Sequence, residues 1–338
     1  MSFLDPNGDL CIQVGKSPVI SFIVCSKTLV RTSDFWNKLL NGEFKESRDS
    51  TVELPEDDPR PMALLLNIVH GRFDQVPGYQ DVMDIQYLYN ISVLTDKYAM
   101  THVLRPWAPG WLRSRDFLGE KPDVSLREQY CHERLWISWE LGDKANFEKI
   151  ANILLLKSST STEGANSLRC DGVLEPPDIY EILEQTRLDM IEALLTPLND
   201  IIQRLIRKDE EFCDEDDCLG LMLGTCIQSL YSNGLWPIPQ PADVPWSVSD
   251  LSAKLKTIEI NGNNSVYHFC SHGSALKDKV EGVLSSIPSL LTEVHYRHLD
   301  SQAMKSGLGP IKPNGVVNGS EKEMSKQKLN RAKRVRVG

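Results

Sequence analysis

Two stretches near the amino terminus alternate apolar and polar residues, which is the period of a β-strand with one buried face. They are residues 10–14 and 20–24, and the Gly-Lys-Ser-Pro segment at residues 15–18 predicts a turn between them. Residues 51–54, Thr-Val-Glu-Leu, predict a third short strand. Together these segments indicate a small β-sheet.

Helical patterns surround the predicted strands. Residues 25–32 and 33–40 predict two short helices, with Ser33 as the N-cap of the second and Gly42 as its left-handed C-cap. The second of these helices carries four large apolar residues on about two turns, which is more than one buried face needs. These residues are Phe35, Trp36, Leu39 and Leu40.

Three further helices are predicted before residue 113. Asp58 caps the first of them and Pro59 opens it, because proline is favoured at the first helical position. Its apolar stripe is formed by Met62, Leu65, Leu66 and Val69. Residues 81–100 predict a longer helix, and residues 102–112 predict one that is kinked at its two prolines. The mixture of strands and helices predicts an α+β fold.

Several segments of this region have a recognisable order and spacing. They are Asp9-Leu10 and residues 24–29, 33–36, 54–59, 64–70, 93–98 and 104–107. In that order they resemble a BTB/POZ domain, in the form found in many filamentous-fungal proteins. The resemblance covers roughly the first third of the chain and implies a protein–protein interaction domain at residues 1–115. Members of that family form dimers, recruit transcriptional corepressors, or bridge substrates to cullin-type ubiquitin ligases.

The chain departs from the family pattern near Asp9. Many animal BTB domains have histidine followed by a basic residue where this chain has Cys25-Ser26, and the basic residue pairs with the first-strand aspartate. Since an unpaired buried carboxylate is costly, we expect backbone donors or water to satisfy Asp9. Only eight residues precede Asp9, so an exchanged N-terminal strand is not expected.

The rest of the chain predicts a mainly α-helical domain at residues 116–306. A strong helix is expected at residues 178–195, interrupted near Pro197 and resumed to Arg207. Ser249 is expected to cap a later helix, and the last helix is expected at residues 289–305. The Gly234-Leu235-Trp236-Pro237 step and a nearby Cys/His cluster resemble the region that follows the BTB domain in many fungal proteins.

Charge is distributed unevenly along the 338 residues. The formal net charge is −10, yet seven basic and two acidic residues follow from Glu321 onward. Residues 307–338 have too few apolar groups to fold and predict a disordered basic tail. That tail is either a nuclear import signal or a solvated end, and the candidate residues for import are Lys328, Arg331, Lys333, Arg334 and Arg336. The acidic remainder disfavours direct binding to nucleic acid.

Targeting and cysteine patterns favour an intracellular protein. The sequence shows neither a secretion signal at its start nor an apolar run long enough for a membrane span. Its eight cysteines are scattered rather than arranged as a disulfide framework, which fits a reducing compartment. We therefore expect the nucleus or the cytoplasm and no membrane partner.

Cysteines and histidines in the helical half could bind a metal ion. Cys213, Cys218, His268 and Cys270 offer three thiolates and one imidazole, a set that suits a tetrahedral structural zinc site. The spacing is looser than that of a zinc finger. The alternative is a group of half-buried thiols and surface histidines.

Signatures of catalysis are weak. Gly15-Lys16-Ser17 resembles half of a phosphate-binding loop, but Leu10 stands where that loop needs glycine and Pro18 stands where a helix should begin, so a hairpin turn is expected. Cys131 and His132 are adjacent, so on a helix they point in different directions. An enzyme would need the Cys/His cluster as an open metal site, with Glu210 or Asp217 as the base.

The favoured interpretation is a non-enzymatic adaptor. Partner contacts are assigned to Phe35, Trp36 and Leu39, with Phe35 or Leu39 partly exposed. The partners considered are a second copy of the chain, a cullin-type ligase and a transcription regulator. A metal-dependent enzyme that uses the Cys/His cluster is the alternative.

Overall fold

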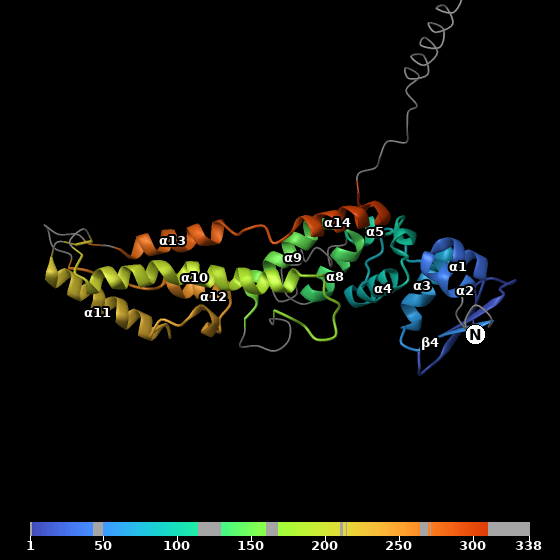
Figure 1. Ribbon diagram of the computed structural model, residues 1–338, viewed down its shortest axis with the longest axis horizontal. Helices are drawn as coiled ribbons and strands as arrows, with labels where there is room; N and C mark the ends of the chain where they lie inside the picture. The colour runs from blue at the N-terminus through green and yellow to red at the C-terminus, as the bar shows by residue number, and fades with distance from the viewer. Residues whose placement is uncertain are drawn as a thin grey trace, which may run out of the picture.

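The computed structural model describes residues 2–42, 50–113, 130–159, 168–209, 212–213, 215–263, 270 and 272–309. The molecule is elongated, with a small sheet at one end and a bundle of long helices at the other (Figure 1). The fold is α+β and mostly helical, as the sequence predicts.

Four strands form one mixed sheet in the order β1-β3-β2-β4. β2 (Leu10–Val14) pairs antiparallel with β3 (Ile20–Val24) and parallel with β4 (Thr51–Leu54). All three strands lie where the sequence predicts them. The two-residue β1 (Ser2–Phe3), parallel to β3, was not expected, and it is too short for a period to show in the sequence.

A hairpin turn joins β2 to β3, as expected. Gly15 has φ +86°, a conformation that glycine adopts without steric cost. Lys16 forms an exposed ion pair with Glu56 at 2.6 Å between Nζ and Oε1. The interpretation of this segment as a turn rather than a phosphate-binding loop is therefore confirmed.

Two short helices, α1 (Ser26–Thr32) and α2 (Asp34–Asn41), follow the hairpin. The Ser33 hydroxyl accepts hydrogen bonds from the first turn of α2, which confirms it as the N-cap. The prediction for Gly42 is wrong, since it ends α2 in an extended conformation with φ −83°.

The next helix, α3 (Pro59–Val69), begins after the cap Asp58 as predicted, and a single 3₁₀ turn at Phe73–Gln75 (η2) follows it. α4 (Ile85–Lys97) is shorter than expected, because it begins four residues after its predicted start, behind the cap Asp84.

The predicted kinked helix at residues 102–112 is instead two pieces, η3 (Thr101–Leu104) and α5 (Ala108–Trp111). Proline has no N–H for the helical ladder, so the two prolines divide the segment rather than bend it.

Two helices of the second region form the middle of the molecule. α8 (Cys131–Leu141) ends at Gly142, which has φ +75°, and α9 (Lys144–Lys157) follows at once. The last helix, α14 (Glu293–Ser306), runs beside them and packs on α8. It starts four residues later than predicted, after the cap Thr292.

The long helix α10 (Ile179–Ile206) continues through Pro197, so the predicted interruption is wrong. Leu194, Leu195 and Leu198 are buried on either side of the proline. Their packing offsets the loss of one hydrogen bond, which sequence propensity alone does not reveal.

Three helices pack around α10 at the far end: α11 (Asp216–Ser232), α12 (Val248–Lys256) and α13 (Gly273–Ser285). A 3₁₀ turn, η4 (Pro241–Asp243), lies before α12. Ser247 caps α12, two residues before the predicted cap Ser249. α13 was not predicted, because only Leu276 and Val280 are buried on it and two residues make a weak stripe.

The first third of the chain and the helical remainder share one apolar core. α4 packs against α8, and η3 packs against α14. The described residues on the two sides of the predicted boundary at residue 115 therefore pack against each other. Among the residues that the structure describes, each helix is too short or too polar to span a bilayer.

Candidate functional site

An aromatic cluster anchors α2 to the end of α4. The ring of Trp36 stacks on that of Tyr98, with centroids 5.1 Å apart, and Phe35 meets the edge of Tyr98 at 5.0 Å. The Trp36 side chain is fully buried, whereas Phe35 is 36% exposed. Adjacent residues on a helix point about 100° apart, so only one of the two can face the core completely.

Polar contacts hold Tyr98 in place. Its hydroxyl donates a hydrogen bond to Asp57, whose other carboxylate oxygen lies 2.5 Å from Lys97 Nζ. The Ser33 hydroxyl donates to the Tyr98 carbonyl oxygen at 2.5 Å. Burial, followed by the carboxylate of Asp57, raises the pKa of the Tyr98 phenol, which therefore stays a donor.

The partner residues predicted on α2 have different positions. Phe35 is exposed, as predicted, and Leu39 lies one turn later and is half-buried against the core. The assignment of Trp36 to a partner surface is corrected, because its side chain belongs to the core.

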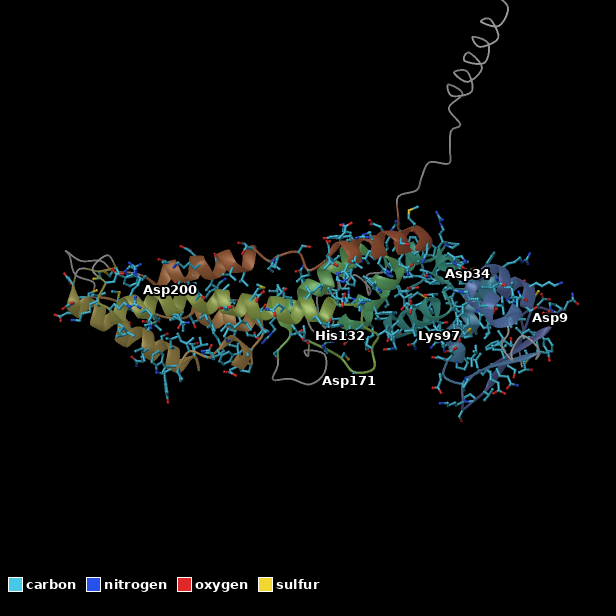
Figure 2. The ribbon with its side chains drawn as sticks, viewed as in Figure 1. Asp9, Asp34, Lys97, His132, Asp171 and Asp200 are labelled. Carbon is cyan, nitrogen blue, oxygen red and sulfur yellow. The ribbon has the colours of Figure 1, made fainter. Side chains whose placement is uncertain are left out.

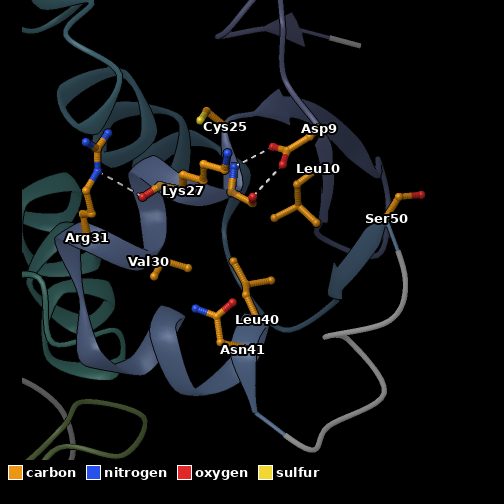
Figure 3. A pocket seen from close by; sticks show the side chains of 10 residues that line it. Asp9, Leu10, Cys25, Lys27, Val30, Arg31, Leu40, Asn41 and Ser50 are labelled. Atoms are coloured by element: carbon orange, nitrogen blue, oxygen red, sulfur yellow. Dashed lines mark hydrogen bonds between the residues drawn. The ribbon is translucent and has the colours of Figure 1, made fainter.

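A hollow of about 650 Å³ lies between β2, α1 and the end of α2 (Figure 3). Its apolar lining includes Leu10, Val30 and Leu40. Lys27 and Arg31, both exposed, line it as well and give it a basic character. Such a hollow suits an apolar side chain with acidic neighbours.

Asp9 at one side of this hollow has its donors. Its two carboxylate oxygens accept hydrogen bonds from the backbone N–H and the hydroxyl of Ser26, each at 2.7 Å. These two bonds lower the pKa of Asp9. The expectation that backbone donors replace the missing basic partner is confirmed, and Asp9 is exposed rather than buried.

A second candidate site lies in the helical half. The Sγ atoms of Cys213, Cys218 and Cys270 lie within 4.8 Å of one another, and that of Cys270 is 3.5 Å from that of Cys213. Cys213 and Cys218 are buried and Cys270 is partly buried. The structure thus brings together the three cysteines that the sequence proposed, while His268 lies outside the described residues.

The surroundings of the three thiols are tight. Burial raises the pKa of Cys218 and raises that of Cys270 to about 12. The backbone N–H of Asn263 donates to Cys218 Sγ at 3.2 Å. A Cβ at Gly262 would lie 2.6 Å from that sulfur, so only glycine fits there. The sequence reasoning missed Gly262, because no spacing rule marks it.

A basic pocket of about 550 Å³ lies close by, between α10 and α13. One wall is the ring of His272 stacked on that of Phe212, with centroids 3.8 Å apart. Arg204 and Arg207 from α10 and Lys279 from α13 line it too. None of the three cysteines is among its lining residues. Asp200, another lining residue, lies near the opposite end of the molecule from Asp9 (Figure 2).

The other catalytic candidates are dispersed or buried. Asp217 is exposed in the first turn of α11, and Glu210 lies outside the described residues. Cys131 and His132 are both buried, and His132 Nδ1 lies 2.8 Å from the Tyr180 hydroxyl. This contact makes His132 part of the core of α8 and α10.

Comparison with known proteins gives no further assignment. No protein-family model, no curated protein and no solved structure matches the chain. The import candidates Lys328, Arg331, Lys333, Arg334 and Arg336 lie outside the described residues. The resemblance to BTB/POZ domains and the import signal therefore stay predictions.

Proposed function

We propose that the protein is a non-enzymatic adaptor whose residues 1–115 form a BTB/POZ-like docking domain. Support comes from the order of elements, in which a strand hairpin, the α1–α2 pair, a third strand and then α3 and α4 follow one another. The main support is the hollow beside α1 and α2, because it presents apolar side chains next to basic ones. It also borders α2, the helix predicted to contact partners.

The chemistry of the hollow specifies the partner. Lys27 and Arg31 favour acidic neighbours, while Val30 and Leu40 favour an apolar side chain. We infer that the partner presents an extended or helical polypeptide segment of that composition. Phe35, exposed on the same helix as Leu40, supplies a further aromatic contact of the kind enriched at binding hot spots.

Light scattering on the full-length chain, alone and mixed with a purified cullin scaffold, tests this proposal. A complex with the cullin supports substrate recruitment to a ubiquitin ligase, whereas a homodimer without cullin binding supports a scaffold for transcription regulators. A chain that stays monomeric in both measurements contradicts the proposal.

Variants locate the surface. Phe35→Asp, and separately Lys27→Glu combined with Arg31→Glu, should weaken association at least tenfold, because single hot-spot residues contribute about 2 kcal/mol or more. Lys38→Glu is the matched control, since Lys38 is exposed on α2 and does not line the hollow. Circular dichroism checks that each variant is folded. Equal losses in the control and the test variants would place the contact elsewhere.

The alternative of a metal-dependent enzyme has less support. Among the described residues, the ligand group around Cys213 contains three thiols and no carboxylate, and Asp217 points to solvent. A hydrolytic metal site needs a base beside the metal-bound water.

A further inference from the structure

We propose that Cys213, Cys218 and Cys270 bind one zinc ion as thiolates, and that this ion fixes the tip of the helical half. The three residues come from different segments. Cys213 lies between α10 and α11, Cys218 is in the first turn of α11, and Cys270 precedes α13. One ion would therefore connect the ends of three helices.

The distances suit tetrahedral coordination. Zinc–sulfur bonds of about 2.3 Å at tetrahedral angles place sulfur atoms about 3.8 Å apart. The three Sγ atoms here lie within 4.8 Å of one another, with one pair at 3.5 Å. Shifts of about 1 Å or less bring all three onto a common ion.

Two features of the backbone favour charged sulfur at this place. The Asn263 N–H points at Cys218 Sγ, and thiolates that bind metals commonly accept such hydrogen bonds. Cys218 is also the third residue of α11, where the positive end of the helix dipole stabilises an anion. Gly262 leaves the space that this sulfur occupies.

The donor set selects the ion and its role. Soft thiolates favour zinc over magnesium or calcium. Binding three thiols to Zn²⁺ releases three protons to solvent and leaves a complex with one negative charge. Cys213 and Cys218 are buried, and the adjoining 550 Å³ pocket is lined by none of the three cysteines. This arrangement fits a structural ion, with a fourth donor completing the tetrahedron.

Zinc binding would also shape the basic pocket. Phe212 directly precedes Cys213, and His272 lies two residues after Cys270, so the two stacked rings extend from the segments that the ion joins. Removing the ion is therefore expected to separate these two walls.

Metal analysis of the full-length chain, purified without chelators after growth with zinc, is the first test. We expect about one zinc per chain. Cys218→Ser and Cys270→Ser should each reduce the content below about a tenth of an equivalent, because a buried site that lacks one thiolate no longer holds the ion. Cys226→Ser is the matched control, since Cys226 is buried on α11 two turns after Cys218 and lies outside the cluster.

A glycine variant tests the geometry without removing a ligand. Gly262→Ala should weaken zinc affinity about tenfold in competition with a chromophoric chelator, because the added methyl displaces Cys218 Sγ. Gly224→Ala, where an added Cβ meets nothing within 4 Å, should leave the affinity unchanged.

Cobalt provides a readout that does not depend on variants. The wild-type chain with Co²⁺ in place of Zn²⁺ should show thiolate-to-cobalt charge transfer and the intense visible bands of a tetrahedral site.

The proposal is overturned if the wild-type chain holds less than about a tenth of an equivalent of zinc even after titration. It is also overturned if Cys226→Ser loses zinc as Cys218→Ser does. A disulfide between Cys213 and Cys270 in protein purified with a reductant present would overturn it as well.

Discussion

In the described structure, the carboxylate of Asp57 accepts hydrogen bonds from two side chains, the Tyr98 phenol and the Lys97 ammonium group. This carboxylate is almost fully buried. We expect Tyr98→Phe to lower the free energy of unfolding by about 2 kcal/mol, because a hydrogen bond to a charged group is lost while the charge stays buried. Urea unfolding at neutral pH measures this change.

Tyr87→Phe is the matched control for that prediction. Among the described residues, the Tyr87 hydroxyl reaches only the Arg60 carbonyl, at 3.5 Å and near the surface, so its loss should cost less than about 0.5 kcal/mol. Equal effects of the two variants would show that the Asp57 contact contributes little.

At the level of single residues, local chemistry was predictable from the sequence and distant partners were not. Ser33 and Asp58 are caps because their side chains act on neighbours two or three positions away. Trp36 is buried because it stacks on Tyr98, 62 positions later. The residues near Trp36 in the sequence do not predict this contact. The three cysteines were grouped correctly because their shared chemistry, rather than their spacing, linked them.

At the level of elements, a strong hydrophobic period was sufficient to predict a helix or strand, and a weak one was not. β2 and β3 each bury one face and were predicted from alternation. α13 buries two residues on one stripe and was missed, while α10 passes through a proline that its packing tolerates.

The junction between α8 and α14 depends on Gly142. An alanine there would keep an unfavourable φ of +75°, and its Cβ would lie 2.1 Å from the backbone nitrogen of Ala303 in α14. We expect Gly142→Ala to lower the free energy of unfolding by more than about 2 kcal/mol, since it adds backbone strain and pushes α14 away. Hydrogen exchange should show lost protection in α14.

Gly172→Ala separates the effect of backbone strain from that of the close contact with α14. Gly172 has φ +80°, and an added Cβ meets nothing within 4 Å, so only backbone strain of about 1 kcal/mol remains. If the two alanine variants were equally stable, close packing between α8 and α14 would not explain the glycine.

On the scale of the whole molecule, one buried carboxylate connects three regions of the chain. Glu140 on α8 accepts hydrogen bonds from Thr95 at 3.0 Å, from Thr101 at 2.6 Å and from Gln302 of α14 at 2.7 Å. The first two donors belong to the first third of the chain and the third to the last helix. The network links described residues on both sides of the predicted boundary at residue 115, and these residues share one apolar core.

Burial raises the pKa of Glu140 from 4.5 to about 7, and the nearby Asp96 adds to this, while the bonds from Thr101 and Thr95 and the charge of Lys305 oppose it. The folded state therefore holds the proton more tightly than the unfolded chain does. The stabilisation from protonated Glu140 is complete below about pH 4.5 and is lost as the pH rises through about 7. Its size is on the order of 3 kcal/mol.

Glu140→Gln should remove this part of the pH dependence, because the amide stays neutral throughout. The Gln302 Oε1 atom, which is buried and has no hydrogen-bond partner in the described structure, can accept from the new amide. Glu192→Gln, at an exposed position of α10, should retain the wild-type slope between pH 4.5 and 7. Urea unfolding across that range is the measurement. A wild-type slope in Glu140→Gln would mean that Glu140 is already ionised in the folded protein at pH 4.5, and the junction would then be held by a buried charge.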